Sequence, residues 1–499
     1  MELSVIYSRA MAGIQAPLVR VETHLSNGLP AFHIVGMPET AVRESKDRVR
    51  SALLNSYFEF PDRRITINLS PADLPKEGGR FDLPIALGIL VASNQLPSAH
   101  LHQHEFLGEL ALDGTLRPIP GVIPAAREAT AEKRKLVVPA PCARLAAHTP
   151  NSAVIAAEDL LTLCAHLNGS EAFEPTAAAS VPTSHHYPDL DVVMGQELAR
   201  RALEIAASGG HNLLLFGPPG TGKTLLASRL PGILPPPAAE DALTGLALRS
   251  FYDSTDVSAW SRRPFRSPHH NATSAALIGG GSKPRPGEVS LAHGGVLFLD
   301  ELPEFTRHAL EVLREPMESG EVTISRANHK ITYPARFQLI AAMNPCPCGF
   351  DGDPEQNCRC TRNQILRYRQ RISGPLLDRI DLTIAMMRIP TGTLLNNTER
   401  SESSASVKER VVQANALQLE RQGRANALLT GGDLTKFCEL GTAEKGFMQS
   451  AMDTVKLSAR GLHRTLRVAR TIADLEGAVT LNTEHLSEAL AYRNPGLKQ

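Results

Sequence analysis

The sequence has no net charge, so its overall charge does not indicate a partner of opposite charge. Its 499 residues contain 52 lysines and arginines against 52 aspartates and glutamates. A surface for nucleic acid would therefore have to be a local patch or the lining of a ring. Neutrality excludes neither DNA nor protein as a partner, so the function has to be argued from motifs.

The sequence also lacks a long apolar run. The longest one, Leu83–Ala92, has about half the length that a helix needs to cross a bilayer. Residues Met1–Ala10 have neither the basic start nor the hydrophobic stretch of a signal peptide. We therefore expect a soluble, cytoplasmic protein with no membrane partner.

Cysteine is scarce and unevenly placed. Of the seven cysteines, four lie within fifteen residues, as Cys346-Pro-Cys348 and Cys358-Arg-Cys360. Four thiolates on two tight turns can form a tetrahedral Zn²⁺ site, although C-x-C is a less usual spacing than C-x₂-C. A redox pair and free thiols are the alternatives. The pattern argues against a disulfide framework.

No internal repeat is visible, and the length alone predicts about three domains. Residues 1–168 alternate strand-like runs, at Ile65–Leu69 and Leu136–Val138, with helical patterns over Thr40–Leu54 and Leu83–Ala92. Strands interspersed with helices in this way predict an α+β domain.

Three further segments follow this domain. Residues 169–188 turn to Ala, Ser, Thr and Pro, which is typical of a linker. Residues 189–390 contain the apolar strands and glycine-rich turns of an α/β motor core, so the chain as a whole is predicted to be multidomain α/β. Residues 391–499 show helical periodicity, over Val407–Arg421 and Leu462–Glu476, and we expect a C-terminal helical lid.

The middle segment contains a phosphate-binding loop. Asn212–Phe216 is a buried strand, and the next eight residues fulfil the Walker A pattern: Gly217, Pro218, Pro219, Gly220, Thr221, Gly222, Lys223 and Thr224. The glycines let backbone N–H groups face phosphate oxygens, and Lys223 would reach the β and γ phosphates of ATP. Thr224 would give its hydroxyl to Mg²⁺. The alternative is a glycine-rich turn that matches by chance.

Two further strands end in polar side chains. Val296–Leu299 is followed by Asp300 and Glu301, and we expect Asp300 to hold the Mg²⁺ ion and Glu301 to activate the hydrolytic water. Phe337–Met343 is followed by Asn344, whose amide could orient that water. Taken alone these would be surface carboxylates and a turn former. Their order after the phosphate loop favours a catalytic site.

These motifs resemble those of an AAA+ ATPase. Ser373–Asp381 is similar to the arginine-finger segment of the magnesium-chelatase and minichromosome-maintenance branch, with Arg379 as the finger. Such an arginine reaches the nucleotide of the neighbouring subunit, so the resemblance implies a ring of identical chains. The alternative is that Arg379 only pairs with Asp378 or Asp381. By resemblance to the Leu-Arg-x-x-Arg pattern of chelatase motors, Arg467 is the sensor 2 residue.

Two insertions lie between the motor motifs. Arg266–Glu288 interrupts the segment before the strand that ends at Asp300, and Glu321–Tyr333 alternates as a β-hairpin. Both resemble the pore loops of the same AAA+ branch, which follow a nucleic-acid backbone. Arg326 and Lys330 are therefore candidate DNA contacts. The alternative for a hairpin lysine is a role in solubility.

The N-terminal domain sharpens the resemblance. Leu74–Pro84 resembles the Pro-Lys-Asp-Gly-Pro-Ser-Ala-Gly segment of Lon-type proteases, but Arg80 stands where the nucleophilic serine would be. Without that hydroxyl no acyl-enzyme can form, so the resemblance implies a Lon-like fold, of the ribosomal protein S5 domain 2-like type, without peptidase activity. This domain, the motor with its cysteine cluster, and Arg464–Leu475 in the lid are together similar to the YifB/ComM family.

The family implies a hexameric DNA helicase that uses ATP and Mg²⁺. Its members would act on single-stranded or branched DNA and drive branch migration in homologous recombination and natural transformation. Two other functions stay open. An ATPase subunit of magnesium chelatase would leave the Lon-like domain unexplained, and an ATP-dependent protease would need the nucleophile that Arg80 replaces.

Overall fold

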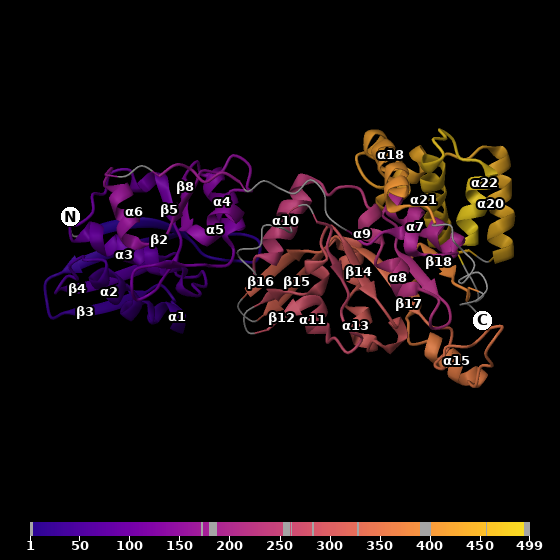
Figure 1. Cartoon of the computed structure of the whole chain (residues 1–499), viewed down its shortest axis with the longest axis horizontal. Coiled ribbons are helices and arrows are strands. Elements are labelled where there is room, and N and C mark those ends of the chain that lie inside the picture. The colour runs from indigo at the N-terminus through magenta and orange to yellow at the C-terminus, as the bar shows by residue number, and fades with distance from the viewer. Residues whose placement is uncertain are drawn as a thin grey trace. The chain divides into compact units, whose positions relative to one another are not determined.

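The computed structural model describes residues 3–170, 173–178, 187–252, 260, 262–281, 284–326, 329–389, 401–455 and 457–493. The chain packs as two compact units, and the fold is mixed α/β and multidomain, as the sequence predicts (Figure 1). The first unit contains Met1–Thr183, Ala239–Arg262 and Ser325–Tyr333, and the second contains Ser184–Ala238, Arg263–Ile324 and Pro334–Gln499. Among the described helices, none combines the length and the apolar character that crossing a bilayer requires.

A four-stranded sheet forms one part of the first unit. Its order is β1-β2-β4-β3, and only β3 and β4 run parallel. The strands are β1 Leu3–Arg9, β2 Leu18–Ser26, β3 Ala31–Val35 and β4 Arg64–Ser70. Helix α3, Asp82–Ala92, is buried at every residue and packs against β1 and β2. The predicted strand over Ile65–Leu69 and the predicted helix over Leu83–Ala92 are confirmed.

The helical pattern over Thr40–Leu54 is confirmed, with one interruption. The structure has two helices, α1 Thr40–Arg43 and α2 Ser45–Asn55. At the break the buried Ser45 hydroxyl donates a hydrogen bond to the buried carboxylate of Asp82. Local periodicity does not reveal this hydrogen bond, because Asp82 lies in α3, far away in the sequence.

A second sheet of the first unit is parallel, in the order β5-β8-β9. It comprises β5 His104–Phe106, β8 Lys135–Pro139 and β9 Val154–Ala157, with helices α4 Val122–Ala131, α5 Ala140–Ala146 and α6 Leu160–Leu167 and the strand pair β6 Glu109–Leu110 and β7 Leu116–Arg117. Strand β8 confirms the run predicted at Leu136–Val138. Helix α10, Ala239–Arg249, joins the core of this sheet through Leu246 and Ala247. The domain boundaries predicted from sequence, near residues 168, 188 and 390, stay predictions.

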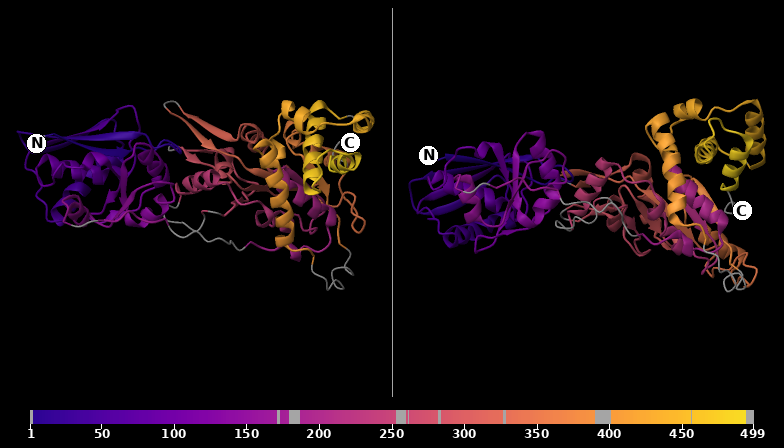
Figure 2. Two further views of the ribbon diagram at one scale, coloured as in Figure 1. Left: turned by 90° about the horizontal axis from the view of Figure 1, so that it is seen from above. Right: turned by 45° about the horizontal axis from the view of Figure 1, so that its top comes forward.

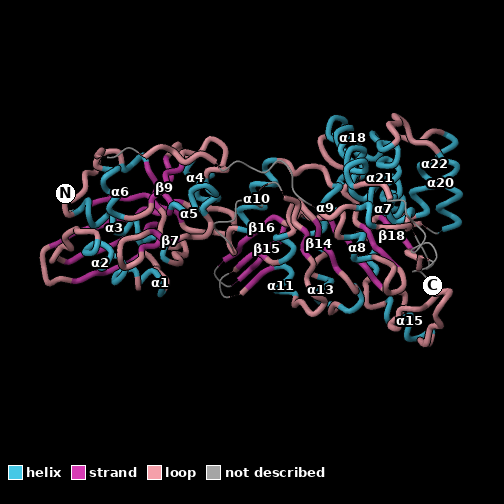
Figure 3. Tube along the Cα trace, in the orientation of Figure 1, coloured by secondary structure: helices cyan, strands magenta, loops and turns pink. Residues whose placement is uncertain are grey.

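The second unit is built on a five-stranded parallel sheet in the order β11-β14-β17-β10-β18 (Figures 1 and 3). Its strands are β10 Leu213–Phe216, β11 Phe265–Arg266, β14 Val296–Leu299, β17 Gln338–Met343 and β18 Leu382–Ala385. The neighbouring strands β14 and β17 are buried along their whole length, as parallel strands covered on both faces require. Because all five strands run the same way, the residues that follow β10, β14 and β17 meet at one edge.

Nine helices of this unit precede or follow the strands of the sheet along the described part of the chain. They are α7 Glu197–Gly209, α8 Lys223–Ala227, α9 Leu230–Ile233, α11 Ser274–Ile278, α12 Glu288–Leu291, α13 Arg307–Glu311, α14 Arg314–Ser319, α15 Arg362–Arg369 and α16 Gly374–Leu377. Two strand pairs accompany them, β12 Gly279–Gly280 with β13 Arg285–Pro286, and β15 Glu321–Arg326 with β16 His329–Pro334. The second pair confirms the hairpin predicted over Glu321–Tyr333.

Helices α18 to α22 gather together in the C-terminal part of the chain (Figure 2). They are α18 Ser404–Gln422, α19 Gly431–Phe437, α20 Thr442–Val455, α21 Ala459–Leu475 and α22 Thr483–Ala491. The apolar face of α21, which includes Val468 and Ile472, shares a core with Leu213 and Ile340 of the parallel sheet. The helices predicted over Val407–Arg421 and Leu462–Glu476 are confirmed.

Candidate nucleotide site

The Walker A loop connects the carboxyl end of β10 to the start of α8. Gly220 and Gly222 have φ angles of 79° and 86°, a left-handed backbone that glycine adopts without a steric penalty. Gly217 is needed for a different reason, since a Cβ atom there would lie 2.2 Å from the backbone oxygen of Met386. Backbone conformation at Gly220 and Gly222, and lack of space at Gly217, therefore favour glycine at all three positions.

Lys223 ties the loop to the end of β17. Its Nζ donates hydrogen bonds to the backbone oxygens of Gly217 at 2.7 Å and Pro218 at 2.8 Å, and to Oδ1 of Asn344 at 3.1 Å. Burial lowers the pKa of Lys223 to about 8, against the opposing effect of the nearby carboxylates of Asp300 and Glu301. The predicted phosphate ligand and the predicted water-orienting amide are thus in direct contact.

Two carboxylates follow β14 at the same edge. The Thr224 hydroxyl donates to Oδ2 of Asp300 at 2.6 Å, and oxygen ligands of these two kinds suit Mg²⁺. Glu301 has a left-handed φ of 52°, and its backbone N–H donates to Oδ1 of Asp300 at 2.9 Å. The Glu301 carboxylate contacts Nδ1 of His270 at 3.1 Å. The sequence motifs assign no role to His270, because no local pattern indicates its partner.

A proton-uptake experiment would test the state of Lys223. With a pKa of about 8, Lys223 is about half deprotonated at pH 8 when no ATP is bound. The phosphates would raise this pKa, since nearby negative charge favours the ammonium form. ATP binding should therefore take up about half a proton at pH 8 and about a tenth of a proton at pH 7. Calorimetry in buffers of different ionisation enthalpy measures the proton uptake at each pH. Equal uptake at pH 7 and pH 8 would contradict a lowered pKa of Lys223.

The predicted arginine finger and sensor 2 residue lie away from Lys223 and the carboxylates that follow β14. Arg379 and Arg467 both line a cavity of about 420 Å³ in the second unit. Residues that precede strands β10, β17 and β18 line the same cavity, namely Asn212, Phe337 and Asp381. These are the amino ends of the strands, whereas Lys223 follows the carboxyl end of β10. Within one chain, the arginines and Lys223 therefore lie at opposite edges of the sheet.

Arg379 does not make the ion pair with Asp378 that is one alternative to a role as arginine finger. Its guanidinium donates to the backbone oxygen of Pro375 at 2.6 Å and pairs with Glu318. Asp378, one of the two partners that the sequence suggests, is instead bound by Arg464 at 3.1 Å. The Glu318 side chain is 61% exposed, and an ion pair with so exposed a partner contributes little to stability. Arg379 can therefore exchange this partner at low cost.

The cavity is basic beyond the two predicted arginines. Helix α21 adds Arg460, His463 and Arg464 to its lining, at the spacing of one helix face. Nε of Arg467 is buried and has no hydrogen-bond partner within the described part of the chain, and burial lowers the pKa of Arg467. The carboxylates of Glu318, Asp378 and Asp381 line the cavity as well, and Glu318 and Asp378 pair with Arg379 and Arg464. Four arginines against three carboxylates leave an excess of positive charge, which suits an anion with several oxygen atoms, such as a phosphate.

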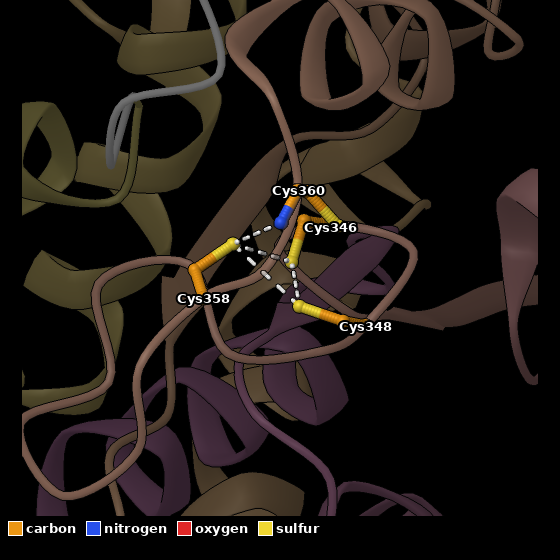
Figure 4. A group of neighbouring side chains, drawn as sticks. All are labelled: Cys346, Cys348, Cys358 and Cys360. Atoms are coloured by element: carbon orange, nitrogen blue, oxygen red, sulfur yellow. Dashed lines mark hydrogen bonds between the residues drawn. The ribbon is translucent and has the colours of Figure 1, made fainter.

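The four clustered cysteines converge, as Figure 4 shows. The Sγ atom of Cys346 lies 3.3 Å from that of Cys348 and 3.6 Å from that of Cys358, and all four ligand atoms, including that of Cys360, lie within 4.8 Å of one another. In a tetrahedral Zn²⁺ site with Zn–S bonds of about 2.3 Å, the sulfur atoms are about 3.8 Å apart. The cluster therefore fits zinc in donor type and in spacing.

Comparison with known proteins identifies the family. Models that describe the magnesium chelatase subunit ChlI match residues 21–141 and 189–394, and a model of the ChlI C-terminal region matches residues 401–493. The chain is 50% identical to the uncharacterized protein YifB of Salmonella typhimurium, over 99% of this chain and 97% of the relative. It is also 50% identical to competence protein ComM of Haemophilus influenzae, over 99% of this chain and 98% of the relative. The chain belongs to the YifB/ComM family.

Membership of the YifB/ComM family makes the chain an AAA+ ATPase of the magnesium-chelatase type. A more distant relative is the DNA replication licensing factor Mcm6 of Drosophila melanogaster, 23% identical over 42% of this chain and 26% of that protein. The family resemblance inferred from the sequence motifs is therefore confirmed. The roles of the individual site residues stay predictions.

The two DNA contacts predicted for this YifB/ComM family member belong to the β15–β16 hairpin. Lys330 is exposed on β16, so its ammonium group is open to a ligand. Arg326 ends β15, and its side chain lies outside the described part of the structure. Gly279 of the preceding insertion lies against the same hairpin, since a Cβ atom there would come within 2.9 Å of Ile324 Cδ1.

Arg80, at the position of the absent serine, has a buried side chain. Its Nη2 donates to the backbone oxygen of Pro120 at 2.7 Å, and burial lowers its pKa to about 10. A guanidinium group held in this way offers no hydroxyl for acyl transfer. The contact indicates packing rather than peptidase chemistry at this position.

Proposed function

We propose that this AAA+ ATPase assembles into a hexameric ring and couples ATP hydrolysis to movement along DNA. The observation that carries the proposal is the separation of Lys223 from Arg379 and Arg467 at opposite edges of one sheet. A basic cavity at one edge and a phosphate loop at the other allow each chain to complete the site of a neighbour. The names of its relatives, competence protein and DNA replication licensing factor, favour DNA as the substrate.

The site residues have separate tasks in this proposal. The loop backbone and Lys223 bind the phosphates of ATP, and the Thr224 hydroxyl and the Asp300 carboxylate hold Mg²⁺. Glu301 takes a proton from the attacking water, and Asn344 orients that water through its amide. The contacts of Lys223 with Asn344 and of Thr224 with Asp300 support these tasks, because they bring the side chains within reach of one phosphate group.

The neighbouring chain would supply the remaining groups. Arg379 would spread the charge that develops on the transferred phosphoryl group, and Arg467 would act beside it as sensor 2. Both line the same basic cavity, and Nε of Arg467 is buried there with no partner among the described residues. An anion brought by a second chain would satisfy such a group, which favours a homo-oligomer, and we infer a hexamer by analogy with the AAA+ branch.

We infer that the ring acts on single-stranded or branched DNA, in branch migration during homologous recombination and natural transformation. The exposed Lys330 and the neighbouring Arg326 on the β15–β16 hairpin are the proposed phosphate contacts. We infer a Lon-like fold for residues 1–168 and a chelatase-type helical lid for residues 391–499. We also infer that the protein acts in the cytoplasm, where the DNA is.

A second candidate is an ATPase subunit of magnesium chelatase. It is favoured by the models of subunit ChlI that match three parts of the chain. Purified protein tested with ATP on a forked or three-stranded DNA separates the two functions. We expect DNA to stimulate hydrolysis and strands to be displaced by the native protein but not by Lys223→Ala. If DNA does not change the rate of ATP hydrolysis and no strand is displaced, the DNA function is contradicted. The chelatase subunit would then be the better candidate.

We also propose that the four clustered cysteines hold zinc. Elemental analysis of gently purified protein should find about one zinc per chain. Cys358→Ser should lower this content, because it removes one of four ligands. Cys438→Ser is the matched control, since Cys438 is a buried free thiol outside the cluster. Less than about 0.2 zinc per chain in the native protein would contradict the zinc site.

A further inference from the structure

Helix α15 ends at Arg369, whose side chain connects three segments beside the nucleotide site. Its Nε donates a hydrogen bond to the backbone oxygen of Pro345 at 3.1 Å, and its Nη2 donates to Oδ2 of Asp351 at 2.8 Å. The Arg369 side chain is only 16% exposed. Charge-assisted hydrogen bonds from a largely buried guanidinium hold their acceptors more firmly than those of a solvated side chain. Arg369 therefore holds the residue that directly follows Asn344.

The same guanidinium lies over the residue that precedes the phosphate loop. Its central carbon is 5.5 Å from the centre of the Phe216 ring, within the range of a cation–π interaction. Phe216 ends β10, and the next residue, Gly217, donates its backbone N–H to the oxygen of Met343 at 3.2 Å. One arginine thus contacts the residue before the loop and the residue after Asn344.

The cysteine segment, residues 346–360, lies against the phosphate loop as well. A Cβ atom at Gly349 would come within 2.7 Å of Cδ of Pro219 in the Walker A loop. Gly349 has a φ of 88°, and its N–H donates to the backbone oxygen of Cys346 at 3.0 Å. Packing this close leaves no free space between the two segments, so a displacement of one is felt by the other. The position of the cysteine segment therefore affects the position of the loop.

Asn344 lies where these contacts meet. Its Oδ1 accepts the hydrogen bond of Lys223 at 3.1 Å, and its chain neighbour Pro345 is bound by Arg369. The amide can orient an attacking water only at a fixed distance from the phosphates, and a displacement of about 1 Å can slow a reaction about 10²-fold. A guanidinium suits the task of fixing this distance, because its rigid fork donates in several directions at once and an ammonium group lacks that geometry.

We propose that Arg369 is a positioning residue for ATP hydrolysis, which holds the Asn344 amide at its working distance from the phosphate loop. The inference rests on the proposed role of Asn344 in orienting the attacking water. Arg369 acts through Pro345 on the amide, through Phe216 on the loop, and through Asp351 on the cysteine segment. The Walker A loop binds phosphates without this contact, so ATP binding and hydrolysis should respond differently to its loss.

Steady-state phosphate release over a range of ATP concentrations tests this role. Arg369→Ala should lower kcat roughly 10- to 100-fold, the effect of displacing a catalytic group by about 1 Å. The KM for ATP, and the Kd of the non-hydrolysable analogue AMP-PNP measured by calorimetry, should stay within about threefold of the native values. Arg369→Lys, which keeps the charge but not the fork, should lower kcat about three- to tenfold. Arg367→Ala is the matched control, since Arg367 is an exposed arginine of the same helix and should keep the native kcat.

A double variant separates positioning from a general structural role. In the Asn344→Ala background, Arg369→Ala should change kcat by less than about twofold, because the amide that it positions is already absent. If the two losses multiply instead, Arg369 acts somewhere other than on Asn344, and the proposal is overturned. It is also overturned if both Arg369 variants keep kcat within about twofold of the native value.

Folding and metal content are measured on the same samples. Arg369→Ala should melt near the native temperature and contain as much zinc as the native protein, because the four thiols are unchanged. Loss of zinc from this variant would show that Arg369 maintains the cysteine cluster instead, which contradicts the proposal. If Arg369→Ala does not fold, Arg369→Lys is compared in the same two backgrounds. A native kcat of Asn344→Ala would remove the proposed role of Asn344 itself, whereas an impaired Asn344→Ala beside a fully active Arg369→Ala would remove only the positioning role.

Discussion

Lys223→Ala is expected to lower ATP hydrolysis by roughly 10²- to 10³-fold, the usual cost of losing one donor that stabilises charge in a transition state. The ammonium group lies between the loop oxygens of Gly217 and Pro218 and the Asn344 amide, so no other described cation occupies its place. Loss of this charge should weaken both phosphate binding and the chemical step. A coupled-enzyme assay of phosphate release over a range of ATP concentrations measures the two effects separately.

The matched control for this variant is Lys445→Ala. Lys445 is exposed on α20 and should keep the native rate. Both variants should melt near the native temperature, because Lys223 contributes a partly desolvated charge rather than apolar packing. Hydrolysis by Lys223→Ala within about threefold of the native rate would show that this loop is not the hydrolytic site.

The motor site is predictable from sequence because its signals are local. A glycine loop between an apolar strand and a helix fixes where the phosphates would bind, and polar residues directly after β14 and β17 must meet at the same edge of a parallel sheet. This is why the sequence alone suffices to place Asp300, Glu301 and Asn344 together. The strands themselves follow from runs of apolar residues that match strand length.

Contacts between distant segments are not predictable in the same way. The contact of His270 with Glu301 and the packing of α10 within the first unit join residues whose local patterns show no sign of each other. The hydrogen bond of Ser45, the first residue of α2, is of the same kind, since its partner Asp82 lies in another helix. Resemblance to the Leu-Arg-x-x-Arg pattern of chelatase motors is what selects Arg467, whereas its position beside Arg379 depends on the three-dimensional packing of α21.

Arg379→Ala is the second variant with a large expected effect. An arginine finger contributes roughly 10³- to 10⁵-fold to hydrolysis, so the variant alone should be almost inactive. Because Arg379 lies at the amino ends of the strands and Lys223 at the carboxyl end of β10, the two residues should serve different nucleotides. Arg379→Ala should consequently bind ATP with nearly native affinity, and Lys223→Ala should not.

Mixing the two inactive variants decides whether the finger acts across an interface. In a ring assembled from equal amounts of both, about a quarter of the interfaces join an intact loop to an intact arginine. Hydrolysis should then recover to about a quarter of the native rate if interfaces act independently. The double variant mixed with Lys223→Ala is the control, since no interface in that ring has both groups. If the first mixture stays as inactive as the second, Arg379 does not reach the nucleotide of a neighbour, and the ring would need another explanation.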